Sequence, residues 1–553
     1  MALFRKALRL WPWLAAITTG LLCAGCFAPF NQTWLCWIAL TPLLAAIWFS
    51  GEDLKRRWLR DVSLGYVAGL PFFWTVFFWL RTVTVPGLVL VGFYMAIYFA
   101  GWSWLCGLLR PAPRAAAASK RWAPQLNESL ENRSPWLRST NNLRLAFLLS
   151  SAWVTQEWLR SLVLTGWGWN TLGSSLHGQL AMIQIVEFTG GAGLSFLVAW
   201  TNVILLATTR RFILEIQGRP MRLHYDLTFT MAAIVGVMGY GVHALQIHRE
   251  TKPLGVALVQ ANIPHEQKFS PEFSQRIFDQ YTRLSSPLLS TAVRPALIIW
   301  PESSMPAPVL EDEQSYQFVV NFSAAAKTDL LLGTIEQEEN RAFNAALLVS
   351  DSGRQLQLYR KVHLVPFGEY VPGRHIIPFI SGVVGDQVPD DFAFGKEYTV
   401  FHLTSGKAEV APLICFEDTI GDLTRQFVLA GADLLANVTN DGWFLRSAGS
   451  QQHLANAVFR CVETRRPMVR AANTGVTCFI NEFGRITETL LDEQGSQFTD
   501  GVLTGEVALP VRRELTFYVR HGELFAESCV TVTVIALIIL FLSLVRRRFY
   551  LRA

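Results

Sequence analysis

Eight apolar runs, each close to the length that crosses a lipid bilayer, constrain the fold of this chain more than any other feature. A transmembrane helix needs about 20 apolar residues. Seven runs precede a long polar region and one follows it; they lie near residues 11–30, 34–50, 62–80, 86–109, 145–165, 186–208, 227–247 and 524–545. The sequence therefore predicts a multi-span α-helical membrane domain.

The composition agrees with this interpretation. Charged residues make up 16% of the 553 residues and hydrophobic residues 51%, whereas an average soluble domain has about 25% charged residues. Of 19 Trp residues, 17 precede residue 253, and Trp favours the membrane–water interface. We expect the first half of the chain to lie in the membrane and most of the second half outside it. The net charge of +5 is modest, and we expect no nucleic-acid partner.

The basic residues predict the orientation of the spans. If all eight spans are real, 22 Lys and Arg residues fall on one side, in the N-terminus, in alternate loops and in the C-terminal tail. By the positive-inside rule that side is the cytoplasm. The alternative that residues 1–26 form a cleaved signal peptide is weaker, because a second apolar run follows almost at once.

Three segments follow from this topology. Residues 1–250 are expected to form a membrane domain with seven transmembrane helices, interrupted by a flexible cytoplasmic loop at 110–143. Residues 251–520 are expected to form an extracytoplasmic domain, and residues 521–553 an eighth helix with a basic cytoplasmic tail. The loop is rich in Ala, Pro, Ser and Asn, a composition typical of flexible connections.

The polar region alternates short β-rich runs with helical stretches, which favours a layered α/β domain. We predict helices at 271–286, 312–327, 419–430 and 447–465. We predict strands at 254–260, 296–300, 329–335, 344–350, 409–415, 432–438, 468–473 and 476–480.

Three polar residues at loop positions beside the predicted strands suit acyl-transfer chemistry. Glu302 comes after the apolar run Ala-Leu-Ile-Ile-Trp-Pro, and a desolvated carboxylate there has a raised pKa and works as a general base. Cys415 ends a predicted strand before a helix, a position that favours the thiolate. Lys361 would stabilise that thiolate and an oxyanion. Together they predict a Glu-Lys-Cys catalytic site.

The residues around these three resemble the catalytic blocks of the nitrilase (carbon–nitrogen hydrolase) superfamily, at 300–303, 360–370 and 414–417. Eight spans around such a domain resemble one membrane-embedded branch, the apolipoprotein N-acyltransferases. Segments that also fit this branch are Leu-Val-Gln-Ala-Asn-Ile at 258–263, Thr-Asn-Asp-Gly-Trp-Phe at 439–444 and the Arg- and Asn-containing stretch 465–475.

This resemblance implies a nitrilase-like α-β-β-α sandwich and a two-step, ping-pong reaction at the periplasmic side of the bacterial inner membrane. Cys415 would take an acyl chain from the sn-1 position of a phospholipid, typically phosphatidylethanolamine, as a thioester. The acceptor would be the free α-amine of a diacylglyceryl-cysteine at the N-terminus of an apolipoprotein, which completes lipoprotein maturation. No metal or cofactor is implied.

The resemblance also implies a role for each site residue. Glu302 would be the general base, while Lys361 and the backbone N–H of Phe416 would hold the oxyanion. Glu369 would position Lys361 or the substrate. Glu417 and Trp443 are further candidates close to the site, although a carboxylate at the position of Glu417 is equally typical of a solvated helix start.

Two departures from the family pattern and one loop concern the substrate. Phe269 stands where the family often has Trp, and Phe416 where it often has Tyr. Both remain aromatic, so we expect the shape of the site to survive. The apolar segment 375–384, which contains Phe379, is expected to act as a lid that dips into the bilayer; the alternative is an ordinary buried loop.

Two other functions stay open on the sequence alone. A membrane-tethered carbon–nitrogen hydrolase would use the same triad on a small amide, with water as the acceptor and no need for seven preceding spans. A transporter with an appended domain would place ionisable residues in the middle of its spans. Glu157, Arg160 and Glu187 lie near the ends of runs instead, which disfavours the transporter.

Overall fold

The computed structural model describes residues 2–51, 54–110, 135–216, 223–268, 270–291, 293–374 and 390–550. The chain forms two compact units. One is helical and contains Met1–Ile185, Gly191–His243 and Glu523–Ala553. The other contains Val186–Gly190 and Ala244–Gly522, and we call it the catalytic unit.

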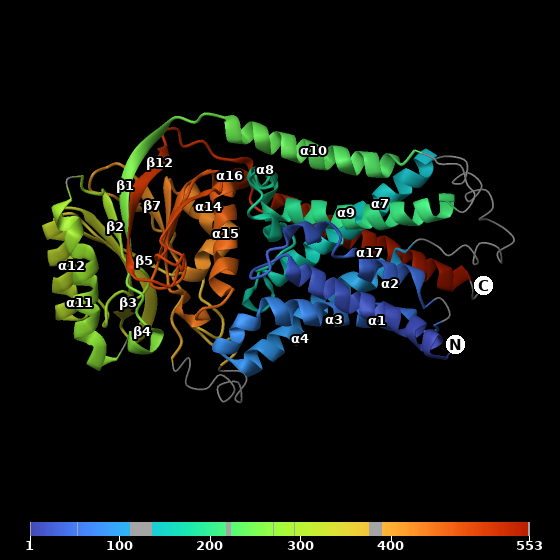
Figure 1. Cartoon of the computed structure of the whole chain (residues 1–553), viewed down its shortest axis with the longest axis horizontal. Helices are drawn as coiled ribbons and strands as arrows, with labels where there is room; N and C mark the ends of the chain where they lie inside the picture. The colour runs from blue at the N-terminus through green and yellow to red at the C-terminus, as the bar shows by residue number, and fades with distance from the viewer. Residues whose placement is uncertain are drawn as a thin grey trace. The chain divides into compact units, whose positions relative to one another are not determined.

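A helix lies at each of the eight predicted apolar runs. These helices are α1 (Ala2–Gly25), α2 (Thr41–Phe49), α3 (Arg57–Val76), α4 (Val85–Leu108), α7 (Pro135–Arg160), α9 (Val186–Ile216), α10 (Tyr225–Gln246) and α17 (Leu524–Tyr550) (Figure 1). Among the described residues, α4, α10 and the greater parts of α9 and α17 are long and apolar enough to cross a membrane.

The outward faces of these helices suit lipid rather than water. On α17, Ile539 and Phe541 are 61% and 65% exposed, and an apolar surface of this kind marks contact with a membrane or a partner. The apolar parts of α1 and the α2 region, Leu10–Gly25 and Thr33–Phe49, are shorter. The count of eight spans therefore stays a prediction.

The predicted loop at 110–143 is wrong at its C-terminal end. Helix α7 begins at Pro135, so residues 135–143 are helical, while 111–134 lie outside the described residues. Pro is favoured at the first position of a helix because its missing N–H has no intrahelical partner there. The helix start was missed because the segment is rich in Ala, Pro, Ser and Asn, a composition that we interpreted as a loop.

The catalytic unit contains two six-stranded sheets (Figure 1). The first has the order β12-β1-β2-β3-β4-β5, with β12 at Gly501–Pro510, β1 at Thr251–Gln260, β2 at Leu297–Ile299, β3 at Asp329–Glu338, β4 at Arg341–Val349 and β5 at Leu356–Arg360. The second has the order β11-β10-β9-β8-β7-β6, with β11 at Ile486–Thr489, β10 at Cys478–Ile480, β9 at Met468–Ala472, β8 at Leu434–Thr439, β7 at Glu409–Ile414 and β6 at Phe401–His402.

Helices cover the outer face of each sheet. Helices α11 (Ser274–Ser285) and α12 (Glu313–Ala326) lie on the first sheet, and α14 (Gly421–Leu429) and α15 (Gly449–Thr464) on the second (Figure 1). This arrangement confirms the predicted α-β-β-α sandwich. All four predicted helices are present, with boundaries within a few residues of those expected.

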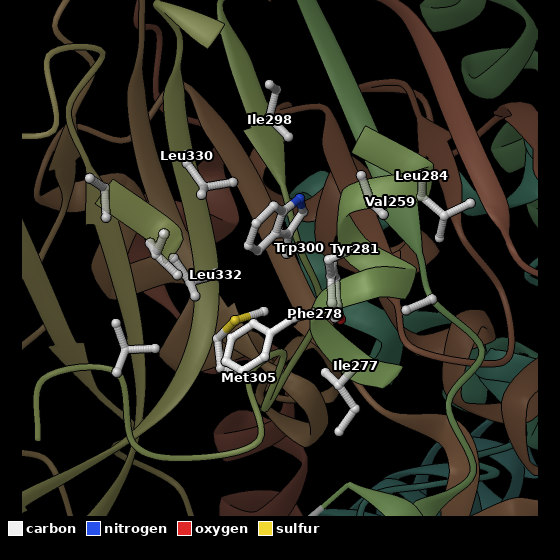
Figure 2. Close-up of a cluster of buried hydrophobic side chains, with 14 of the residues drawn as sticks. Val259, Ile277, Phe278, Tyr281, Leu284, Ile298, Trp300, Met305, Leu330 and Leu332 are labelled. Atoms are coloured by element: carbon white, nitrogen blue, oxygen red, sulfur yellow. The ribbon is translucent and has the colours of Figure 1, made fainter. Parts of the chain in front are cut away.

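A buried aromatic cluster joins α11 and α12 to the first sheet (Figure 2). Trp300, which directly follows β2, is fully buried. Its ring lies 4.8 Å from that of Tyr281 on α11 and 5.0 Å from that of Phe322 on α12, measured between ring centroids. Aromatic pairs at these separations add to the stabilisation that burial provides. The cluster therefore fixes the end of β2, from which the chain continues to Glu302.

Candidate active site

The ends of three strands carry the three residues predicted to be catalytic. Glu302 follows β2, Lys361 directly follows β5 and Cys415 directly follows β7. The structure brings the three side chains close enough for strong electrostatic coupling. Burial raises the pKa of the Cys415 thiol, the carboxylate of Glu302 raises it further, and the ammonium of Lys361 opposes both.

Glu302 lies in a desolvated pocket with one amide donor. It is buried, and Nδ2 of Asn344 on β4 donates to its Oε1 at 2.8 Å. Burial raises the pKa of Glu302, Lys361 lowers it and Glu369 raises it again, while the hydrogen bond from Asn344 lowers it. The net shift is upward, as a general base that works near neutral pH requires.

Lys361 is held by a second carboxylate, that of Glu369. Its Nζ donates to both carboxylate oxygens of Glu369, at 2.9 and 2.8 Å. Burial lowers the pKa of Lys361, but Glu369 and Glu302 outweigh it, so the pKa is raised and the side chain carries a positive charge. A buried, pre-oriented ammonium of this kind stabilises an oxyanion at low reorganisation cost.

Cys415 occupies a backbone conformation that is rare for residues other than glycine. Its φ is 52°, in the left-handed region, and such strain is typical of functional positions. The Cys415 carbonyl accepts from Asn437 Nδ2 at 3.0 Å. The pKa of the Cys415 thiol is raised, because desolvation outweighs the ammonium of Lys361, so the unliganded site does not favour the thiolate that we expected.

Glu417 is a buried anchor rather than a solvated carboxylate. One carboxylate oxygen accepts from the backbone N–H groups of Val362 and His363 and from the Tyr359 hydroxyl; the other accepts from the N–H of Ile414. Burial raises its pKa to about 7, against the opposing effect of Lys361. Glu417 therefore ties the segment that carries Lys361 to the segment that carries Cys415.

The other predicted site residues differ in how well the structure places them. Phe416 is buried and its ring stacks on that of His363, with 5.8 Å between the ring centroids. Trp443 lies in the 3-10 turn Asp441–Phe444 and is 37% exposed. Phe269, Phe379 and the predicted lid at 375–384 lie outside the described residues.

Two polar neighbours of the triad were not singled out by the sequence. Asn344 bridges the two carboxylates, since its Nδ2 also donates to Glu369 Oε1 at 2.5 Å. Lys268 is buried and its Nζ donates to the backbone carbonyl of Glu302 at 2.7 Å. Burial lowers the pKa of Lys268 to about 7, while Glu302 and Cys415 oppose that shift. Only the folded structure reveals these roles, because a Lys in a polar loop looks solvated.

The arrangement can support covalent catalysis. Among the described residues, no group of three His, Cys, Asp or Glu side chains is placed to hold a metal ion. A thiol beside a carboxylate of raised pKa and a fixed ammonium can attack an acyl group and stabilise the tetrahedral oxyanion that forms.

Comparison with known proteins assigns both units. The profile of the apolipoprotein N-acyltransferase N-terminal domain matches residues 19–204, and that of the carbon–nitrogen hydrolase domain matches residues 255–517. Relatives named apolipoprotein N-acyltransferase match along most of the chain. The protein from Geobacter metallireducens is 33% identical over 94% of this chain and 93% of its own length. That from Chlorobaculum tepidum is 29% identical, covering 95% and 96%.

A third relative, from Haemophilus ducreyi, is 32% identical over 70% of this chain and 74% of its own length. The level of identity and the extent of these matches exceed what a shared catalytic domain alone would give, because they include the helical unit. The chain therefore belongs to the apolipoprotein N-acyltransferase family, whose members are acyltransferases built on a carbon–nitrogen hydrolase domain.

Proposed function

We propose that this protein transfers the sn-1 acyl chain of a phospholipid to the α-amine of a diacylglyceryl-cysteine at the N-terminus of an apolipoprotein. The names of its relatives support a lipoprotein substrate. The apolar helices support a membrane setting in which donor and acceptor are both lipid-anchored. Phosphatidylethanolamine is the donor we expect.

In the first step, Sγ of Cys415 attacks the ester carbonyl carbon while Glu302 takes the thiol proton. The oxyanion is held by Lys361 and by the backbone N–H of Phe416. The ester C–O bond then breaks, and Glu302 returns the proton to the leaving glycerol oxygen. The products are a thioester on Cys415 and a lysophospholipid.

In the second step, the neutral amine of the lipoprotein attacks the thioester carbonyl. Glu302 takes a proton from the attacking nitrogen and delivers it to the departing sulfur, so that an amide forms and the thiol is restored. Glu369 keeps Lys361 oriented through both steps by its two hydrogen bonds. Trp443, Phe269 and Phe379 are proposed to contact the substrates.

We place the reaction at the periplasmic face of the bacterial inner membrane. The support is the charge pattern, since 22 basic residues fall on the opposite side of the eight predicted spans. Lipids anchor both substrates in one plane there, which raises their effective concentration at the site.

One observation carries the proposal. Hydrogen bonds through Asn344 and Glu369 connect Glu302 to Lys361, and Glu417 ties the Lys361 segment to the Cys415 segment, in a chain that also carries long apolar helices. The test is a single-turnover assay with purified protein and phosphatidylethanolamine alone. We expect one equivalent of lysophospholipid and a thioester on Cys415, followed by a stall. Adding a diacylglyceryl-cysteine peptide should restart turnover and yield an amide.

Two variants and one outcome make this assay decisive. Cys415→Ala should show neither burst nor turnover, and Glu302→Gln should lose the burst because the base is gone. Steady release of free fatty acid without the peptide would contradict acyl transfer and support the hydrolase alternative.

A further inference from the structure

A cluster of four charged or ionisable side chains lies buried behind the segment that carries Cys415. We call it the charge cluster; its members are Asp418, Asp441, His453 and Arg470. Each is at most 1% exposed. They come from the 3-10 turn after β7, the turn after β8, helix α15 and strand β9. The catalytic steps above use none of them.

The four side chains form ion pairs with one another. His453 Nε2 lies 2.8 Å from Asp418 Oδ1, and its Nδ1 lies 3.0 Å from Asp441 Oδ1. Arg470 pairs with both carboxylates, at 3.4 Å from Asp418 and 3.2 Å from Asp441. Removing one member of such a buried set leaves the charges of the others uncompensated. Because a carboxylate contacts each ring nitrogen of His453, the imidazole is held in a fixed position.

One atom of the charge cluster contacts the backbone of Cys415, the residue that carries the nucleophilic sulfur. His453 Nε2 also lies 3.3 Å from the carbonyl oxygen of Cys415. A carboxylate faces each ring nitrogen, Asp418 at Nε2 and Asp441 at Nδ1, which favours a proton on both; in the resulting imidazolium Nε2 is a donor. The Nε2–H group therefore lies within hydrogen-bond distance of the Cys415 carbonyl. Asn437 Nδ2, from β8, donates to the same carbonyl at 3.0 Å.

That carbonyl controls the direction of a neighbouring N–H. The C=O of Cys415 and the N–H of Phe416 belong to one peptide unit, which is planar and trans, so the two groups point in opposite directions. Two donors that hold the carbonyl from one side thus aim the N–H toward the other side. The left-handed φ of Cys415 makes such support necessary, because an unsupported backbone would relax to a commoner conformation.

We propose that His453 is a positioning residue for acyl transfer: together with Asn437 it fixes the Cys415 carbonyl and thereby aims the Phe416 N–H at the oxyanion. The inference rests on the proposed function, in which that N–H is an oxyanion donor. The other members of the charge cluster act through His453, by holding its ring in place.

The experiment compares two reactions of the same thiol. Acylation of Cys415 needs the oxyanion donors, whereas alkylation by iodoacetamide passes through no oxyanion. Both are measured in the purified full-length protein, with p-nitrophenyl butyrate and phosphatidylethanolamine as two separate acyl donors. The variants are His453→Met, which removes the donor, and His453→Gln, which keeps an N–H on a side chain of similar reach.

We expect His453→Met to acylate about 10- to 100-fold more slowly at saturating donor, since loss of an oxyanion donor costs about 100- to 1000-fold and here the donor is misaimed rather than removed. KM for the donor should stay near the wild-type value, and the alkylation rate should stay within about threefold. His453→Gln should recover part of the acylation rate. His402→Gln is the matched control, because the His402 side chain is exposed and its ring pairs with Glu409.

Asn437→Leu removes the other donor to the Cys415 carbonyl and leaves the charge cluster intact. If both residues act on this carbonyl, the double variant with His453→Met should lose less than the product of the two single effects. Acylation at the wild-type rate in His453→Met would overturn the proposal, as would a parallel loss of alkylation, which indicates a purely structural role. Acylation of the wild-type protein by the nitrophenyl ester but not by phospholipid would contradict the proposed donor instead, while the ratio of variant to wild type on the ester would still test His453.

Discussion

The pKa values of Cys415, Glu302 and Lys361 are set by two opposing effects, burial and the charges of neighbouring side chains. Burial raises the pKa values of Glu302 and Cys415 and lowers the pKa of Lys361. Only for Lys361 do neighbouring charges outweigh burial: the carboxylates of Glu369 and Glu302 raise its pKa. In the resting site the thiol is therefore protonated, and Glu302 must be ionised before it can accept the proton of Cys415.

This state predicts an acidic limb in the pH profile of acylation. The rate should rise with pH as Glu302 loses its proton, with a midpoint above the ordinary value of 4.5, because its pKa is raised in the folded site. Single-turnover acylation by p-nitrophenyl butyrate between pH 4 and 8 measures this midpoint.

Asn344→Leu provides the matched test of the same limb. The hydrogen bond from Asn344 lowers the pKa of Glu302, so removing it should move the midpoint to higher pH. A midpoint that stays in place or moves down would contradict this account of the site. Glu302→Gln should have no such limb.

The triad could be predicted from the sequence because Glu302 and Cys415 lie at the ends of apolar runs and Lys361 lies within a recognisable local motif. Asn344 and Lys268 could not, because their partner Glu302 lies 42 and 34 residues away in the chain. Likewise, nothing in the sequence near His453 indicates that its ring meets the carbonyl of Cys415, 38 residues earlier. The side chains that tune the catalytic groups therefore depend on tertiary packing.

At the scale of strands, Gly333 on β3 allows the segment after β2 to pass close by. A Cβ at this position would lie 2.5 Å from the Cα of Glu302, a distance that backbone movement must relieve. Gly333→Ala should lower the free energy of unfolding by about 1–3 kcal/mol and reduce the acylation rate, because Glu302 is displaced.

The matched control is Gly255→Ala on β1, where the new Cβ would meet Pro295 at 3.6 Å, an ordinary contact. It should acylate at the wild-type rate. Denaturant unfolding and single-turnover acylation of both variants separate the local clash from a general cost of placing alanine in a strand. Equal losses in the two variants would contradict the steric explanation.

Glu417 links two loops, and its removal should affect both. Glu417→Ala removes the carboxylate that accepts from the N–H groups of Val362, His363 and Ile414, of which Val362 also donates to the Tyr359 hydroxyl. We therefore expect a loss of at least about 2 kcal/mol in the free energy of unfolding. Asp422→Ala, on the exposed side of α14, should change it by less than about 0.5 kcal/mol. Thermal unfolding of the two variants makes the comparison, and equal stability would mean that Glu417 is not an anchor.

Local patterns predicted eight strands and four helices of the catalytic unit, but β5, β6, β11 and β12 escaped them. β12 pairs antiparallel with β1, so that Thr251 lies opposite Pro510. Its partner is therefore about half the chain away, and no local pattern records such a pairing. β6 has only two residues, too few for any periodicity.

For the whole molecule, the charge pattern predicts that the catalytic unit lies outside the cytoplasm. The exposed turn around Ser405 and Gly406, between β6 and β7, is a suitable insertion site for a reporter. A reporter that is active only outside the cytoplasm should give signal there. A signal from a cytoplasm-only reporter at the same site would contradict both the topology and the proposed reaction.

The pairing of β1 with β12 also bears on how such a chain can be assembled and engineered. The chain enters and leaves this sheet through neighbouring strands, and the N–H of Val511 donates to the carbonyl of Glu250 at 3.0 Å. The strands and helices from β1 to β12 thus form a cassette whose two ends meet, the geometry that tolerates domain insertion. A single insertion into one loop of an ancestral helical protein would have sufficed to acquire it. By the same geometry, a short linker from Glu250 to Val511 would excise the cassette and leave the helices on either side joined.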